Sequence, residues 1–282
     1  MPSDDKLQNN KAQSKTAGTT TPKNKVLQNE LLQQGKTTPI KKIALLMAMY
    51  DEAQPIINSL ALVESKEALH PELPMRCFEK TVGSFKLSLV ISGLDQRHEV
   101  DNIGSEAATL MAYETITQLK PDLVISAGTA GGFSKRGAKV GTIYVSEEHF
   151  VYHDRHVPLE GFAQSAVGKY PAAKISRLAK NLHLKTGVIS TGSSLEKNDK
   201  DIIVIDQHNA VAKEMEAAGI AWVAMLFKVP IMALKSITNL LDEDNQSEQE
   251  FVTNLAFASS CLHDKILELV DYLQNKSIED LA

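Results

Sequence analysis

Short, uninterrupted apolar runs, separated by segments with helical spacing, constrain the fold of this chain more than any other feature. The run KKIALLMAM at residues 41–49 is too short for an ordinary helix and is typical of a strand covered on both faces. Similar runs occur at residues 122–132, 186–190 and 229–238. Because strands that alternate with helices usually form a parallel sheet, the pattern predicts a three-layer α/β fold, with a mixed, largely parallel sheet covered by helices.

Other segments complete the expected order of elements. The run FKLSLVISG at residues 85–93 follows a Gly-Ser turn and predicts the second strand of a hairpin. The run IIVID at residues 202–206 predicts a further strand. Helical spacing predicts helices within residues 101–119, 172–182, 213–227 and 247–273. Around the third of these helices one stripe is interpreted as the side facing the core, and it consists of Val211, Met215, Ala218, Trp222 and Met225.

The first 39 residues differ in composition from the rest of the chain. They are rich in Lys, Gln, Asn, Thr and Ser, with few apolar side chains. Such a segment cannot bury enough apolar surface to offset its conformational entropy, so we predict a disordered polar tail at residues 1–39. With 43% hydrophobic residues in a chain of 282, the remainder can form a sizeable core. We therefore expect one domain at residues 40–276 and a C-terminal tail at residues 277–282.

Charge and cysteine content narrow the range of partners and locations. The formal net charge is -5 and the basic residues form no stripe, which argues against nucleic acid as a partner. No apolar run is long enough to span a membrane, and the first residues lack the apolar centre of a secretion signal. Cys77 and Cys261 lie far apart in the sequence, so we expect free thiols and a cytoplasmic protein. The segment YHDRH at residues 152–156 lacks a third ligand at suitable spacing, so no metal is expected.

Ligands of such sheets bind beyond the carboxyl ends of the strands, which makes the residues after each predicted strand the candidates for a site. Glu52 follows the first strand. An acidic residue there can also be explained without a ligand, because a carboxylate near the start of a helix complements the helix dipole. Thr129, Ala130 and Gly131 end another strand, where small residues make a tight turn or let a ligand approach the backbone. Glu216 is the first residue of a row of apolar residues on the predicted helix, so its carboxylate is expected to be buried. Burial of a carboxylate is costly unless it accepts hydrogen bonds, either from N–H groups at the start of the helix or from the hydroxyls of a ligand.

Six motifs follow one another along the chain. They are AMYDEA at residues 48–53, KPDLVISAGTAGGF at 120–133, HDRHVP at 153–158, STGSSL at 190–195, KEMEAA at 213–218 and VPIMALKSIT at 229–238. Together they resemble the purine nucleoside phosphorylase and nucleosidase superfamily, and within it the plant-type 5'-methylthioadenosine nucleosidases. The resemblance covers nearly all of the predicted domain and implies a nucleoside phosphorylase-like version of the α/β fold. No single motif is decisive, but the ordered set is specific.

The resemblance also implies an activity. Members of this family cleave the N-glycosidic bond of 5'-methylthioadenosine with water, releasing adenine and 5-methylthioribose without a metal or an organic cofactor. S-adenosylhomocysteine is a second candidate substrate. The partner is therefore a small-molecule purine nucleoside, and the family implies a homodimer in which the neighbouring subunit closes the pocket.

The same resemblance implies roles for individual residues. Glu52 is similar to the general base that activates the water, and Glu216 is similar to the carboxylate that binds the ribose 2'- and 3'-hydroxyls. The other implied roles are positioning of water and ribose by Thr129 and Lys235, packing under the sugar by Met215, lining of the pocket by the backbone of Ala130 and Gly131, and contact with the base by Leu195.

Asn239 departs from the family pattern. Family members have Asp at this position, an acid that assists proton delivery to purine N7, whereas an amide donates a hydrogen bond but transfers no proton. General acid catalysis typically contributes about 10²- to 10⁴-fold to a rate. Ser193 is a second departure, because the family commonly has an acid there. Both changes lie on the side of the site expected to face the purine.

Three readings of the site stay open at this point. In the first, the chain is a 5'-methylthioadenosine or S-adenosylhomocysteine nucleosidase that is slow or is helped by another acid. In the second, it cleaves a 6-oxopurine nucleoside by hydrolysis or phosphorolysis, and Asn239 is a specificity residue that donates to O6 and accepts from a protonated N7. In the third, the pocket binds a nucleoside without turnover, although Glu52 argues mildly against that reading. The overall resemblance places the first one ahead.

Overall fold

The computed structural model describes residues 38–243 and 247–282, so nearly all of the segment predicted as a tail at residues 1–39 lies outside the described residues. The elements in chain order are β1 (Lys42–Met47), α2 (Tyr50–Leu60), β2 (Val63–Glu64), β3 (Arg76–Val82), β4 (Phe85–Ile91), β5 (Leu94–Asp95), β6 (Val100–Asp101), α3 (Ser105–Leu119), β7 (Leu123–Gly132), η1 (Ser134–Arg136), β8 (Ile143–Tyr152), α4 (Phe162–Val167), β9 (Tyr170–Pro171), α5 (Ser176–Asn181), β10 (Lys185–Thr191), α6 (Asp199–Gln207), β11 (Ala212–Glu214), α7 (Ala217–Phe227), β12 (Ile231–Leu240), α8 (Ser247–Tyr272) and η2 (Glu279–Leu281).

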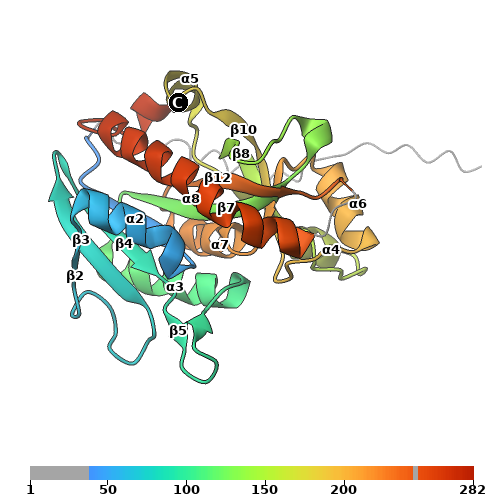
Figure 1. Ribbon diagram of the computed structural model, residues 1–282, viewed down its shortest axis with the longest axis horizontal. Coiled ribbons are helices and arrows are strands. Elements are labelled where there is room, and N and C mark those ends of the chain that lie inside the picture. The colour runs from blue at the N-terminus through green and yellow to red at the C-terminus, as the bar shows by residue number, and fades with distance from the viewer. Residues whose placement is uncertain (1–37, 244–246) are drawn as a thin grey trace, which may run out of the picture. The chain divides into compact units, whose positions relative to one another are not determined.

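One large mixed sheet forms the middle layer of the fold (Figure 1). Its strand order is β11-β10-β8-β12-β7-β1-β4-β3-β2, with β9 beside β8. Strands β4, β1, β7 and β12 run parallel to one another, and β8, β10 and β11 form a second parallel group that meets the first through the antiparallel pair β12 and β8. Strand β11 also pairs with β7, so β11, β10, β8, β12 and β7 form a closed ring.

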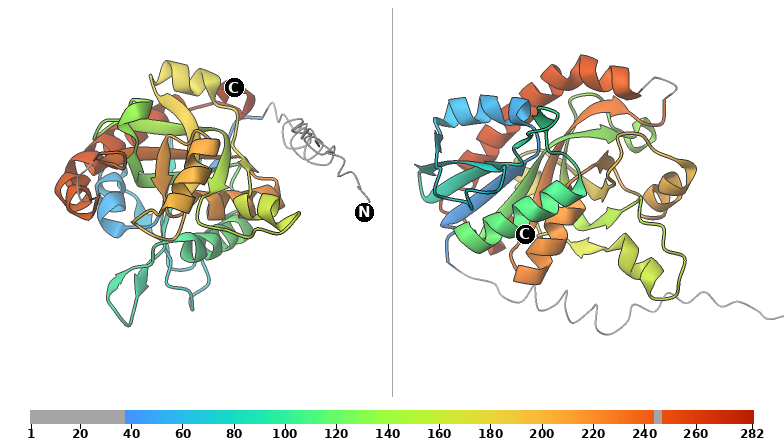
Figure 2. Two further views of the ribbon diagram at one scale, coloured as in Figure 1. Left: turned by 90° about the vertical axis from the view of Figure 1, so that its right-hand side faces the viewer. Right: turned by 90° about the horizontal axis from the view of Figure 1, so that it is seen from below.

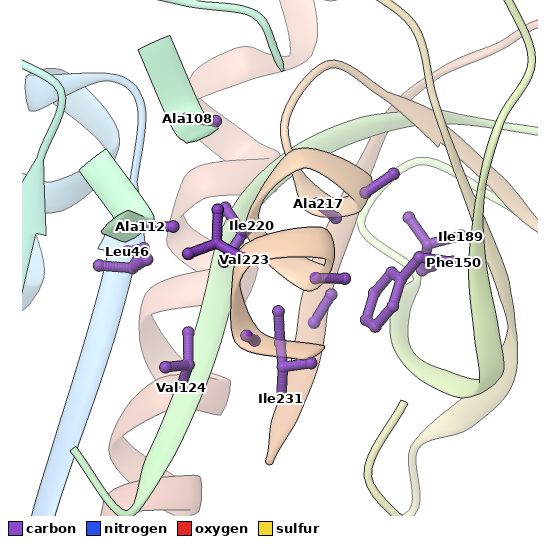
Figure 3. Close-up of a cluster of buried hydrophobic side chains, with 14 of the residues drawn as sticks. Leu46, Ala108, Ala112, Val124, Phe150, Ile189, Ala217, Ile220, Val223 and Ile231 are labelled. Atoms are coloured by element: carbon purple, nitrogen blue, oxygen red, sulfur yellow. The ribbon is translucent and has the colours of Figure 1, made fainter. Parts of the chain in front are cut away.

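Helices cover both faces of the sheet, which confirms the predicted three-layer α/β fold. Figure 2 shows α2 and α8 on one face and α3 and α7 on the other. The central strands read as continuous apolar runs because both of their faces are covered. Figure 3 shows the core beneath α3 and α7, where short alanine side chains of both helices meet branched side chains of the strands. The labelled members are Leu46, Ala108, Ala112, Val124, Phe150, Ile189, Ala217, Ile220, Val223 and Ile231.

The strand predicted at residues 202–206 is wrong, because these residues belong to α6. The Asn198 side chain accepts hydrogen bonds from the backbone N–H groups of Lys200 and Asp201, and the Asp201 carboxylate accepts one from the Asn198 N–H. This reciprocal capping box fixes a helix start just before the apolar run. The capping residues therefore outweigh the strand preference of Ile and Val.

The core stripe predicted around residues 213–227 is correct for Val211 and Ala218, which are buried in the core, but wrong for its largest member. The helix α7 begins only at Ala217, and its buried side includes Ile220 and Val223. Trp222, the largest member of the predicted stripe, is 40% exposed. The spacing of apolar residues identifies a stripe but does not say what covers it. Exposed apolar side chains of α3 and α7 lie together, with the rings of Tyr113 and Phe227 5.9 Å apart, and we call this the α3/α7 apolar surface: Leu110, Tyr113, Trp222, Leu226 and Phe227.

The expected C-terminal tail at residues 277–282 packs on the domain instead. These residues contain the short helix η2, and Leu281 is fully buried. Just before them, the carbonyl of Lys276 accepts a hydrogen bond of 2.8 Å from the N–H of Ile40. The three apolar residues of this six-residue segment, Ile278, Leu281 and Ala282, were too weak a signal to predict this docking.

A small hairpin stands apart from the main sheet. Strands β5 and β6 pair only with each other as a two-stranded antiparallel sheet, labelled by β5 in Figure 1. Elsewhere in the described chain, Cys77 is buried and Cys261 half-buried, and both are free thiols. Among the described helices, none has the length and apolar character needed to cross a membrane.

Candidate active site

A cavity of about 460 Å³ opens at the carboxyl ends of β1, β7 and β12. This is the edge of the sheet at which ligands of α/β proteins bind. The cavity is within the size range of small-molecule sites. All but one of the predicted site residues line it, namely Glu52, Thr129, Ala130, Gly131, Leu195, Met215, Glu216 and Asn239. The remaining one, Lys235, is buried among them.

Glu52 lies in the first turn of α2 but points into the protein, whereas the neighbouring Asp51 is exposed. One oxygen, Oε1, accepts hydrogen bonds from the Thr129 hydroxyl at 2.6 Å and the Thr129 N–H at 3.2 Å. Burial raises the pKa of Glu52 above its ordinary value, although the Thr129 hydrogen bonds and the Lys235 ammonium oppose that shift. A role limited to the helix dipole does not explain this burial. Glu52 therefore has the environment of a base in a partly closed site.

Gly128 allows β7 to pass close to Glu52. Its φ of 155° is a conformation that side chains with a Cβ rarely adopt, and a Cβ would lie 3.2 Å from Glu52 Oε2 and 3.7 Å from Lys235 Nζ. The same distances show that Glu52 and Lys235 both lie close to the Cα of Gly128. A glycine is needed here because the strand, the carboxylate and the ammonium share one small space.

Lys235 forms a buried ion pair with Glu214, a residue that the sequence analysis did not assign to the site. The Nζ of Lys235 lies 2.8 Å from Oε2 of Glu214, and both side chains are almost completely buried. Burial alone would raise the pKa of Glu214, but Lys235 and several hydrogen bonds hold it below its ordinary value. Burial would lower the pKa of Lys235, but Glu214 and Glu216 hold it above its ordinary value. Both partners are therefore charged.

Glu214 also organises the start of α7. Its carboxylate accepts hydrogen bonds from the N–H groups of Glu216 and Ala217 and from the Thr191 hydroxyl. These N–H groups belong to the first turn of a helix, where they have no partner within the helix itself. The alternation of two glutamates just before an apolar helix was the signal that could have identified this role.

Glu216 is the residue that immediately precedes α7, and its Oε1 accepts a 2.9 Å hydrogen bond from the N–H of Gly104. Burial and the nearby Glu214 charge raise the pKa of Glu216 to about 7. The carboxylates of Glu52, Glu214 and Glu216 all interact electrostatically with the Lys235 ammonium. At Glu216, burial and the neighbouring carboxylates outweigh this attraction, so Glu216 is partly protonated near neutral pH.

Asn239 lies near the end of β12, directly after an irregularity in the pairing of β12 with β7. It is 3% exposed, and its Oδ1 accepts a 2.9 Å hydrogen bond from the Thr238 hydroxyl. Asp242 is close in sequence but does not replace the missing acid. Its two oxygens accept hydrogen bonds from the N–H groups of Ser134 and Lys135, and although burial alone would raise its pKa, these bonds hold it below the ordinary value.

Leu195 reaches the cavity from the loop of residues 192–198, between β10 and α6. Ser193, at the second position that departs from the family pattern, is bonded to the start of α3 through Ser105 and Glu106. The two histidines of YHDRH have different hydrogen-bond partners. His153 is hydrogen-bonded to the Ser190 hydroxyl, and His156 is hydrogen-bonded to the Asp201 carboxylate.

The similarity to known proteins extends over the same part of the chain. Residues 42–271 match the family model described as the phosphorylase superfamily. The chain belongs to this superfamily. Its relatives include 5'-methylthioadenosine nucleosidase of Arabidopsis thaliana, 33% identical over 90% of this chain and 93% of that protein. A second relative from the same plant, 5'-methylthioadenosine/S-adenosylhomocysteine nucleosidase, is 34% identical over 89% of this chain and 99% of that protein.

The fold is also similar to solved structures of these relatives. An apo structure of Arabidopsis thaliana 5'-methylthioadenosine nucleosidase is 33% identical, with a TM-score of 0.84 over 86% of this chain and 100% of that one. The family resemblance read from the ordered motifs is therefore confirmed. Glu214 and Lys213 lie in the motif KEMEAA, but the resemblance assigned no role to either of these residues, which hold other site residues in place.

Proposed function

We propose that this superfamily member hydrolyses the N-glycosidic bond of 5'-methylthioadenosine and releases adenine and 5-methylthioribose. The observation that carries the proposal is the buried Glu52, bonded to Thr129, in one cavity with Glu216 and Asn239. The names of the relatives at 33% and 34% identity support the choice of substrate. S-adenosylhomocysteine is the second substrate of this proposal, because one of the two relatives carries its name.

In the proposed reaction, Glu52 accepts a proton from a water molecule while the water oxygen bonds to C1' of the ribose. The C1'–N9 bond breaks, its electron pair leaves with the purine, and the departing purine takes up a proton from solvent water to become free adenine. A carboxylate with a raised pKa is a better base than an exposed one, which suits Glu52 to this step. Glu216 accepts hydrogen bonds from two ribose hydroxyls, and Lys235 offsets the negative charge of the surrounding carboxylates.

Asn239 faces the purine in this arrangement. With its Oδ1 bonded to Thr238, the amide presents its NH₂ group as a donor, which suits the unprotonated N7 of adenine. An amide oxygen accepts two hydrogen bonds, so the contact with Thr238 leaves Oδ1 able to accept from a protonated N7 as well, as in the 6-oxopurine reading. The names of the relatives favour an adenine nucleoside. We place the reaction in the cytoplasm, in keeping with two free thiols.

A chromatographic assay for free base tests the proposal. The purified protein is incubated separately with 5'-methylthioadenosine, S-adenosylhomocysteine, inosine and 5'-methylthioinosine, with and without phosphate. Adenine release independent of phosphate is the expected result. Hypoxanthine release alone would replace the proposal with an oxopurine activity, and phosphate dependence would replace hydrolysis with phosphorolysis. Binding without release of any base would favour a nucleoside-binding protein.

Affinity for the nucleoside is expected to increase as the pH rises through the pKa of Glu216, about 7. The ionised carboxylate accepts from both ribose hydroxyls, so the ligand prefers the ionised form. Between pH 6 and pH 8 the Kd for 5'-methylthioadenosine should therefore fall about tenfold. Calorimetry on the Glu52→Gln variant measures binding without turnover and removes the titration of Glu52.

The matched variant for this pH effect carries Glu216→Gln in addition. Its amide has no charge to titrate, so its Kd should be weaker and independent of pH over the same range. An unchanged slope in this double variant would assign the pH dependence to a group other than Glu216.

We also propose that two copies associate through the α3/α7 apolar surface. Large exposed side chains such as Trp222 and Phe227 are uncommon in a cluster on a monomer and typical of an interface. Ile103, 51% exposed and just before α3, lines the cavity as well, which supports a pocket that a partner subunit helps to close.

The variant Trp222→Glu is expected to shift the protein from dimer to monomer in sedimentation velocity experiments. A charge placed inside an apolar interface would have to be buried without a partner, which is strongly unfavourable. The matched control is Val63→Glu, since Val63 is 69% exposed on the short strand β2 and far from α7 in the fold. A wild-type monomer, or a dimer that tolerates Trp222→Glu, would contradict the proposed interface.

A further inference from the structure

Lys213 is a buried lysine that also lines the cavity. It lies on β11, is 4% exposed, and pairs with Gly131 of β7 on one side and Ser190 of β10 on the other. Its Nζ donates hydrogen bonds to two successive carbonyl oxygens, those of Ser194 at 2.5 Å and Leu195 at 2.9 Å. A single side chain of the closed strand ring therefore holds two peptide groups of the 192–198 loop.

Burying a charged amine is costly, so we expect the charge of Lys213 to have a role in the site. Burial lowers the pKa of Lys213, and the more distant carboxylates of Asp201 and Glu214 offset that effect only in part. Within residues 38–243 and 247–282, the direct partners of the amine are the two carbonyls and not a carboxylate. A buried ammonium without a close counterion is costly, so packing alone would favour an apolar side chain at this position.

The 192–198 loop is tied on its other side as well. The Ser193 N–H donates to Asp154 Oδ2 at 2.8 Å, and the Ser193 hydroxyl lies 2.7 Å from the hydroxyl of Ser105. Ser105 directly follows Gly104, whose N–H bonds to Glu216. The loop thus connects the part of the cavity that contains Leu195 with the carboxylate proposed to hold the ribose.

Lysine is chemically suited to this position. An ammonium has three N–H donors on a flexible stem and can serve two neighbouring carbonyls at once. Hydrogen bonds from a charged donor are also stronger than those from a neutral one. A neutral side chain of similar length, such as Met, would leave both carbonyls without this donor.

On the basis of the proposed function, we infer that Lys213 is a positioning residue that holds the 192–198 loop and so fixes Leu195 against the purine base. Lys213 then sets the affinity of the site for the base, while Glu52 and Asn239 act on bond cleavage. Lys213 begins the motif KEMEAA, but the family resemblance implied no role for it.

The first test is the variant Lys213→Met, with steady-state kinetics on 5'-methylthioadenosine. KM is expected to rise about tenfold, as for the loss of one charge-assisted hydrogen bond, while kcat changes less than about threefold. The matched control is Lys80→Met, because the amine of Lys80 also donates to a backbone carbonyl, that of Leu60, but on the exposed edge of the fold. The control should leave both constants unchanged.

A double-mutant cycle with Leu195→Ala separates positioning from a general loss of structure. If Lys213 acts through Leu195, the KM of the double variant should equal that of Leu195→Ala alone. Fully additive effects would show that Lys213 acts independently of Leu195 and would overturn the inference. A fall in kcat at constant KM would overturn it as well, since Lys213 would then act on the chemical step.

Binding of free adenine, measured by calorimetry, separates this inference from the proposed function. If the wild-type protein releases no base, the proposed hydrolysis fails, but a Kd for adenine that is about tenfold weaker in Lys213→Met still supports the positioning role. An unchanged adenine Kd would contradict it. Should Lys213→Met fail to fold, as judged by circular dichroism, Lys213→Arg provides the second variant, because it keeps the charge and should keep adenine binding within about threefold of the wild type.

Discussion

Replacing Glu52 with glutamine is expected to lower the rate of adenine release from 5'-methylthioadenosine at least about 100-fold, within the range for loss of a general base. Glutamine has nearly the same shape, and its carbonyl can accept the hydrogen bonds that the Thr129 hydroxyl and N–H now donate to Glu52. The cavity should therefore keep its form while its base is lost. Single-turnover release of adenine measures the chemical step, and calorimetry with the same nucleoside measures binding.

The control for this variant is Asp51→Asn, one residue earlier in the same turn of α2. Asp51 is exposed, so its loss should leave both turnover and affinity unchanged. Binding retained together with lost turnover is the result that supports Glu52 as the base. Substantial turnover by Glu52→Gln would remove that assignment, and a parallel loss of binding would show that Glu52 mainly shapes the cavity.

The variant Asn239→Asp is expected to raise the rate of adenine release at least about tenfold, because it introduces a proton donor on the side of the cavity proposed to face the purine. The position is buried, and burial favours the protonated form of a carboxyl group. The introduced carboxyl can accept the Thr238 hydrogen bond that Asn239 Oδ1 accepts now. A pH profile of kcat adds a specific readout, since the variant should lose its gain at alkaline pH, where the new carboxyl ionises.

Asp242→Asn is the matched control for this gain. The Asp242 carboxylate accepts hydrogen bonds from the backbone N–H groups of Ser134 and Lys135 and is not placed to protonate the purine. Its loss should therefore leave the rate of base release, per mole of folded protein, equal to that of the wild type. If Asn239→Asp brings no gain, another group already supplies the proton. A gain of adenine release accompanied by a loss of hypoxanthine release would identify Asn239 as a specificity residue.

The fold was predictable where one physical requirement dominated. Strands covered on both faces must be apolar throughout, which is why β1, β7 and β12 stand out in the sequence. The prediction failed at residues 202–206, where capping by Asn198 and Asp201 decides the structure, and at Trp222, which is exposed. The spacing of apolar residues alone cannot tell which of them are buried.

The residues that line the candidate site were predictable from the sequence, but the residues that hold them in place were not. Glu52, Glu216 and Asn239 stand out because polar residues at strand ends and beside apolar rows need an explanation. The pairing of Glu214 with Lys235 joins β11 and β12, which α7 separates in the chain, and it depends on both strands pairing with β7. The bond from Lys213 to the 192–198 loop depends on the same closure.

The separateness of the β5 and β6 hairpin bears on how such a site can evolve. Its segment contributes Leu94, Glu99, Val100 and Asp101 to the cavity wall, yet its strands share no ladder with the main sheet. Substitutions there can reshape one end of the pocket without breaking a backbone pairing on which the core depends. Selection for a new substituent on the ligand could therefore act on this hairpin while α2, which holds Glu52, and β12, which holds Lys235 and Asn239, stay as they are.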